Sequence, residues 1–138
     1  MYYFDEYLKI ETVEVEDLVF EVGPALEALH RAGRDDAVHE FRERPERAKA
    51  WDVVWLGVHE VERRGGFRDT AVAEIRVPGL VEYVCPHCAS RHKRPIRVVR
   101  ELDSEAEARG CARPRYVYTA ICPYGGLLAW LHRRRPPC

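Results

Sequence analysis

Two short segments that each begin with Cys-Pro constrain the fold of this 138-residue chain more than any other feature. The first is Cys85-Pro86-His87-Cys88, and the second is Cys122-Pro123-Tyr124-Gly125-Gly126. A Cys-x-x-Cys turn presents two thiolates to one tetrahedral metal ion, and a second such turn on a neighbouring strand completes the coordination shell. Gly125 stands where the second turn needs its second cysteine. Three sulfurs are therefore in place, and a fourth ligand has to come from another part of the chain.

The order of elements around these segments resembles the zinc-ribbon class. Over residues 80–126 the chain reads as a strand, Cys-Pro-x-Cys, two further strands and Cys-Pro-x-x-Gly. The resemblance implies one structural Zn²⁺ and carries over Cys85, Cys88 and Cys122 as ligands, while Gly125 departs from the class pattern. It also implies that Cys111 lies at the far end of a hairpin, ~20 Å from the ion.

The expected fourth ligand is chosen by its position along the chain. His92 follows the first cysteine turn by four residues and is our preferred candidate. His87 lies at the tip of that turn, where backbone amides normally point at the sulfurs. His132 and Cys138 reach the site only if the C-terminal segment folds back. The predicted metal ligands are Cys85, Cys88, Cys122 and His92.

Three alternatives to a structural zinc stay open. In the first, the ribbon has lost its ion, and its cysteines are buried or two of them are joined in a disulfide. In the second, Cys85 and Cys88 form a redox pair, although the residues that follow do not read as the helix that would stabilise a thiolate. In the third, the metal is catalytic, as in nucleobase deaminases, although His59 lacks the His-x-Glu spacing of that class. Since the chain has no Gly-rich phosphate loop and no nucleophile elbow, we expect a protein that is not an enzyme.

Hydrophobic periodicity predicts helices in the first half of the chain. Apolar residues within 15–29 follow a helical stripe, and Gly33 ends that helix. Asp35 or Asp36 is expected to cap a short helix, and a longer helix begins at Pro45 and ends at the Gly65-Gly66 pair.

The period changes to about 2 after this glycine pair. Four segments are predicted as strands, at 70–77, 80–84, 96–102 and 116–121, and residues 127–134 are predicted as a short C-terminal helix. The predicted fold is α+β, with an N-terminal helical unit at 1–66 and a β-rich zinc-ribbon-like unit at 67–138.

Composition indicates where such a protein works. No apolar run approaches the ~18 residues of a membrane span, and the N-terminus lacks the basic start of a secretory signal, so we expect a soluble cytoplasmic protein. The chain has no Asn or Gln and one Met, which is typical of a thermophile source.

Charge is divided unevenly along the chain. Residues 1–84 hold 11 Lys and Arg against 19 Asp and Glu, and residues 85–138 hold 11 against 4, so the two parts carry −8 and +7. This charge dipole can direct the C-terminal half to a polyanion, or it can drive self-association.

Basic and aromatic residues alternate in the C-terminal half, as in proteins that contact phosphates and stack on bases. We expect binding to nucleic acid or a nucleoprotein complex through Arg91, Lys93, Arg94, Arg97, Arg115, Arg133 and Arg134. A winged helix made of three helices and a 70–84 hairpin is a second route to DNA, although its recognition helix should be basic and here mixes carboxylates with cations. A module that binds a protein partner or a second copy of itself, without nucleic acid, is the competing prediction.

Overall fold

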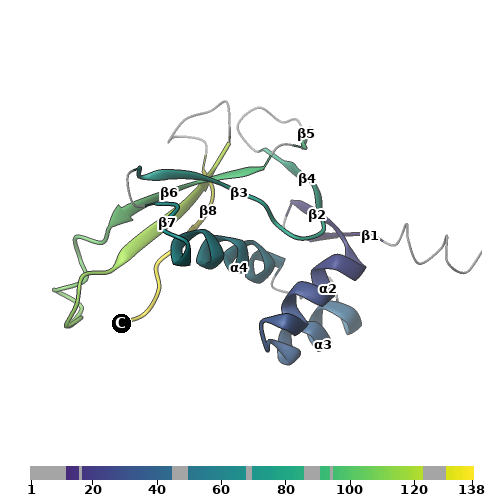
Figure 1. Ribbon diagram of the computed structural model, residues 1–138, viewed down its shortest axis with the longest axis horizontal. Coiled ribbons are helices and arrows are strands. Elements are labelled where there is room, and N and C mark those ends of the chain that lie inside the picture. Colours follow the sequence, from purple (N-terminus) through teal and green to yellow (C-terminus); the bar gives the residue numbers. More distant parts are fainter. Residues whose placement is uncertain are drawn as a thin grey trace, which may run out of the picture.

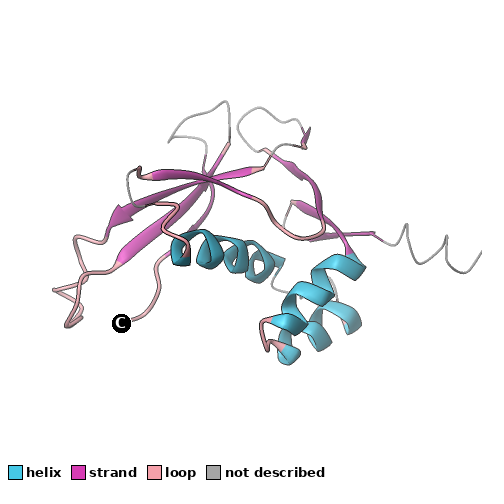
Figure 2. Cartoon of the chain, in the orientation of Figure 1, coloured by secondary structure: helices cyan, strands magenta, loops and turns pink. Residues whose placement is uncertain are grey.

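The computed structural model describes residues 12–15, 17–44, 50–67, 70–85, 91–93, 95–122 and 130–138. Within these ranges the chain forms three helices and two antiparallel four-stranded sheets, and the three helices lie on the same side of the sheets (Figures 1 and 2). The predicted α+β class is confirmed. In chain order the elements are β1 (Thr12–Val15), β2 (Leu18–Glu21), α2 (Val22–Arg31), α3 (Asp35–Glu43), α4 (Ala50–Arg63), β3 (Val72–Ile75), β4 (Leu80–Val84), β5 (Arg91–His92), β6 (Ile96–Leu102), β7 (Tyr116–Ile121) and β8 (Trp130–Arg134).

The first sheet has the strand order β1-β2-β4-β5 and joins the two halves of the chain. β1 and β2 form a tight hairpin in which Asp17 adopts a φ of 67°, and β2 then pairs with β4. The predicted helix is therefore wrong over residues 15–21 and correct only from Val22 to Arg31. Leu18 and Phe20 are buried while the residues between and after them are not, so the burial period here is 2. A short apolar run does not distinguish this period from a helical one.

The second sheet has the strand order β3-β6-β7-β8. β6 and β7 form an antiparallel hairpin with the predicted bounds, in which Arg97 faces Ile121 and Leu102 faces Tyr116. The predicted C-terminal helix is wrong where the structure describes it, because β8 pairs with β7. Residues with good helix propensity form a strand here because β7 supplies a hydrogen-bonding partner.

β3 and β4 belong to different sheets, so they do not form the hairpin that a winged helix requires. The turn between them contains Gly79 at a φ of 79°, and a Cβ there would lie 2.8 Å from the Glu21 carbonyl oxygen. Only glycine fits this combination of positive φ and close backbone approach. The turn directs the chain from the second sheet to the first.

The helices cover one hydrophobic core. α2 stops before Gly33, which has a φ of 71°, as predicted. α3 begins at Asp35 without a side-chain cap, so the predicted capping role is wrong. Asp35 and Asp36 instead lie in the first turn, where their negative charges interact favourably with the positive end of the helix dipole. The predicted start of α4 at Pro45 lies outside the described residues.

α4 carries the largest apolar side chains of the core. Trp51, Val54, Trp55 and Val58 are buried, and the cluster around them includes residues of β2, β4, β6 and β7. The division of the chain at 66/67 remains a prediction about folding units, but one core extends across that boundary.

The C-terminal segment folds back onto the β6–β7 turn. A disulfide joins Cys111 in this turn to Cys138, and the buried carboxylate of Asp103 lies 3.4 Å from the Nε of Arg135. Asp103 also pairs with Arg109 and accepts a hydrogen bond from the backbone N–H of Glu105. Among the described residues, no helix has the length and apolar character needed to cross a membrane.

Candidate metal centre

Three potential ligands lie at the ends of three different strands. Cys85 follows the last residue of β4, His92 ends β5, and Cys122 follows the last residue of β7. β5 pairs with β4 so that His92 faces Tyr83. Cys85 lies two residues beyond Tyr83 in the extended chain, so its side chain is expected on the same face. The first sheet thus contributes two of these side chains and the second sheet one.

The geometry of the cluster suits a tetrahedral metal ion. The ligand atoms of Cys85, His92 and Cys122 all lie within 4.8 Å of one another. The Sγ of Cys122 is 3.6 Å from the Nε2 of His92. A sulfur at about 2.3 Å and a nitrogen at about 2.0 Å from one tetrahedral zinc would lie about 3.5 Å apart. This Cys-His-Cys cluster therefore has the spacing and donor atoms to bind a metal ion.

The cluster is enclosed by protein. Cys85 and Cys122 are fully buried and His92 is 8% exposed. The ring centroids of Tyr83 and His92 lie 5.6 Å apart, and the partly buried Leu131 packs against the cluster that the two cysteines form. Burial keeps competing water away from the sulfurs, and the Tyr83 ring restricts the orientation of the imidazole.

Three of the four predicted ligands are brought together by the fold. The fourth, Cys88, lies outside the described residues, as do His87 and Gly125. The other candidates lie elsewhere: Cys111 and Cys138 form the disulfide, and the ring of His132 stacks on Trp51 of α4 with the ring centroids 4.4 Å apart.

Sequence reasoning missed Tyr83 and Leu131 as neighbours of the cluster. The position of Tyr83 can be predicted, because Tyr83 precedes Cys85 by two residues in a predicted strand and alternate residues of a strand share a face. The position of Leu131 cannot, because Leu131 lies in a segment predicted as a helix.

The predicted nucleic-acid residues are distributed over several surfaces. Arg91 pairs with Glu14 and Glu82 on the first sheet. Arg134 points toward α4, where its guanidinium lies 3.5 Å from the Nε2 of His59 and 5.6 Å from the centre of a Trp55 ring. Arg94 lies outside the described residues.

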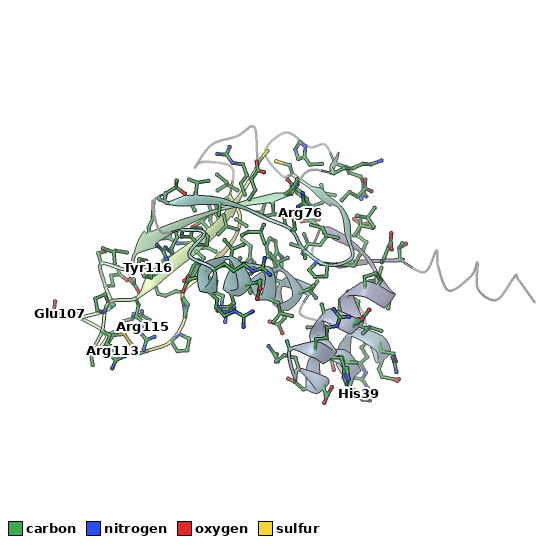
Figure 3. All side chains as sticks on the ribbon, viewed as in Figure 1. His39, Arg76, Glu107, Arg113, Arg115 and Tyr116 are labelled. Carbon is green, nitrogen blue, oxygen red and sulfur yellow. A yellow bond between two sulfur atoms is a disulfide. The ribbon has the colours of Figure 1, made fainter. Side chains whose placement is uncertain are left out.

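The remaining predicted cations are Lys93, Arg97, Arg115 and Arg133. Arg115 is half-buried at the far end of the β6–β7 hairpin, together with Arg113 and Tyr116 (Figure 3). Lys93 and Arg133 are exposed and Arg97 is half-buried. Among the described residues, Lys93, Arg97 and Arg133 have no ion-pair partner.

An open groove of about 940 Å³ lies between α2, α4 and β3. Apolar residues such as Leu56 and Val61 line it together with four arginines, of which Arg63 and Arg64 pair with Glu60. Burial, and then the charge of Arg134, lowers the pKa of His59 in this groove. Arg31 pairs with Glu27, so three of the four arginines in this groove have a carboxylate partner.

The chain matches no protein-family model, no curated protein and no solved structure.

Proposed function

We propose that this is a small, non-enzymatic protein whose fold is stabilised by one zinc ion and whose C-terminal half binds nucleic acid, alone or within a nucleoprotein complex. Zinc suits the cluster because thiolate and imidazole are its usual structural ligands. Cys85, His92 and Cys122 would hold it, with Cys88 as the fourth ligand. A zinc ion bound in this way would supply no reaction chemistry and would fix the ends of β4, β5 and β7 relative to one another.

One observation carries the nucleic-acid proposal. The second sheet has a face turned away from α4, which we call the outer face, and it carries Arg97, Val99, Glu101, Thr119, Trp130 and Arg133. The alternate residues Val98 and Tyr118 belong to the core, so the two arginines of the outer face point to the opposite side. Cations without a carboxylate partner of their own are available to phosphates, and the C-terminal half carries a net charge of +7.

The test compares two double variants that remove the same charge. Arg97→Ala with Arg133→Ala takes two cations from the outer face, and Arg42→Ala with Arg44→Ala takes two exposed cations from α3 and the residue after it. We expect the first pair to weaken binding to a fluorescent 20-nucleotide strand and to reduce the slope of log affinity against log salt by about 1.4. The control pair should leave the slope unchanged.

An equal loss of affinity in both double variants would mean that binding depends on the net charge of the protein and not on the outer face. Absence of binding at 50 mM salt would overturn the proposal. In that case salt-insensitive self-association, measured by analytical ultracentrifugation, would support the protein-partner alternative.

A further inference from the structure

A β-bulge in β8 changes the direction of one side chain. β8 pairs with β7 in regular register from Arg134 to His132, and then Leu131 is skipped and Trp130 faces Ile121. In a regular strand Trp130 and Arg133 would point to opposite faces, because they are three residues apart. The extra residue places both on the outer face.

The cavity on the outer face is consistent with this arrangement. Trp130 and Arg133 line a depression of about 160 Å³ together with Val99, Glu101 and Thr119. His132, which lies between them in sequence, points the other way and stacks on Trp51. The outer face of β8 is thus separate from the face that α4 covers.

Trp130 differs from the other two tryptophans in its exposure. It is 54% exposed, whereas Trp51 is 6% and Trp55 4% exposed. Arg97 lies in the same cross-strand row, because Arg97 faces Ile121 and Ile121 faces Trp130. Two strand spacings place the Arg97 backbone about 10 Å from that of Trp130, within reach of a long side chain.

This arrangement suits an unpaired base better than a base pair. The flat face of an exposed indole stacks on the face of a base, and base faces are accessible in a single strand but covered in a duplex. Arg133 lies further along β8 and Arg97 lies two strands across from Trp130, so both can bind the adjoining phosphates. Glu101 would repel a phosphate in the depression but can accept a hydrogen bond from a base amino group.

We propose that Trp130 stacks on one base of a single-stranded nucleic acid while Arg97 and Arg133 hold the adjoining phosphates. This inference rests on the proposed function and specifies its ligand as single-stranded RNA or DNA. The net charge of +7 on the C-terminal half favours a polyanion over a protein partner.

The test combines strand preference with changes at Trp130. Binding of 12-nucleotide oligo(dT) and oligo(U) is compared with that of a 12-base-pair duplex, for the metal-loaded protein and its Trp130→Ala and Trp130→Phe variants. We expect single strands to bind more tightly than the duplex, and Trp130→Ala to weaken single-strand binding about tenfold to a hundredfold. Trp130→Phe should retain most of the affinity, since it keeps a stacking ring. The two oligonucleotides distinguish RNA from DNA.

Leu102→Ala is the matched control, because Leu102 is the other large exposed apolar side chain that the described residues include, at 66% exposure. It should leave affinity unchanged. Tryptophan fluorescence gives a second readout: bound oligonucleotide should quench the exposed Trp130, and the quenching should vanish in Trp130→Phe while the buried tryptophans report that the fold is intact.

The outcomes separate this inference from the proposed function. Unchanged single-strand affinity in Trp130→Ala, together with loss in the Arg97 and Arg133 double variant, would overturn stacking and keep nucleic-acid binding. Equal affinity for duplex and single strand would likewise overturn base stacking on Trp130 and keep nucleic-acid binding. Absence of binding to all three probes would overturn both proposals, and self-association abolished by Trp130→Ala would assign the outer face to a second copy of the chain.

Discussion

Tyr118 connects the second sheet to α4 through its hydroxyl group. It is 5% exposed, donates a hydrogen bond to Glu62, and packs its ring against Trp55 and Phe67. Arg100 lies 3.9 Å from the same carboxylate and donates to the Phe67 carbonyl oxygen. Burial, and then Glu62, raises the pKa of Tyr118, because both disfavour the phenolate.

Tyr118→Phe should lower the free energy of unfolding by about 1 kcal/mol at pH 7, because Glu62 loses its hydroxyl partner. The pH dependence follows from the sign of the shift. The pKa of Tyr118 is higher in the folded chain than the ~10 of an unfolded one, so its contribution is full below pH ~10 and is lost as the pH rises above that value. Urea unfolding between pH 8 and 11 should show that the free energy of unfolding falls less with rising pH in the variant than in the unchanged protein.

Tyr116→Phe is the control for this measurement. The Tyr116 ring also contacts Arg100, with the guanidinium 4.3 Å from the ring centre, but no hydrogen bond of its hydroxyl is found among the described residues. It should have little effect. Equal effects of the two variants would contradict the role given to the Tyr118–Glu62 hydrogen bond.

At the scale of elements, α4 and β3 approach closely because Gly57 lies between them. A Cβ at position 57 would lie 2.7 Å from the Cγ2 of Ile75 and 3.1 Å from the carbonyl oxygen of Arg76. Neither neighbour can move aside easily, because Ile75 is buried in β3 and the Arg76 oxygen belongs to the backbone. The helix would therefore have to move away from the sheet to accommodate a larger residue.

Gly57→Ala should destabilise the fold by about 1–3 kcal/mol, since overpacking outweighs the gain in helix propensity. Gly23→Ala is the matched control, because Gly23 lies in α2 with nothing within 4 Å of the added carbon. It should be neutral or stabilising by up to about 1 kcal/mol. Thermal unfolding of both variants measures the difference, and a stabilising Gly57→Ala would contradict the close approach.

The elements also show how much of the fold can be predicted from the sequence. The bounds of β4, β6 and β7 follow from alternation between turn signals, and His92 joins Cys85 and Cys122 as its position suggested. Two segments were misassigned for the same reason. β1, β2 and β8 are short, and they are strands because β2 pairs with the distant β4, β1 pairs with β2, and β8 pairs with β7. Local periodicity contains no information about such partners, and the bulge at Leu131 depends on them as well.

At the scale of the whole molecule, the candidate metal centre joins two sheets. Cys85 and His92 belong to the first sheet, and Cys122 ends a strand of the second. A metal ion held by these residues would cross-link the two sheets. Its binding free energy would then contribute directly to folding.

Protein purified without added zinc should contain about one equivalent of zinc per chain, and chelation should lower its unfolding temperature. His92→Ala should weaken metal binding at least tenfold, measured by competition with a chromogenic chelator, because it removes a ligand and not merely a neighbour of one. His39→Ala is the control, because His39 is exposed on α3 (Figure 3). Cobalt substitution would report the thiolates through their charge-transfer absorption.

Absence of metal in the purified protein and after zinc addition would contradict this prediction. The cluster would then be a buried Cys–His hydrogen-bonded pair, with Cys122 and His92 3.6 Å apart. The ion-free ribbon that the sequence left open would be the better description.

The β6–β7 hairpin is bounded at both ends by sulfur. Cys122 follows the last residue of β7 beside the candidate metal centre, and Cys111, in the connecting turn, is tied to Cys138. Strand pairs ordinarily separate from an end, where the fewest bonds have to break. With a metal bound, His92 before β6 and Cys122 after β7 would hold the open end of this hairpin together, so fraying at that end would first require the release of a ligand.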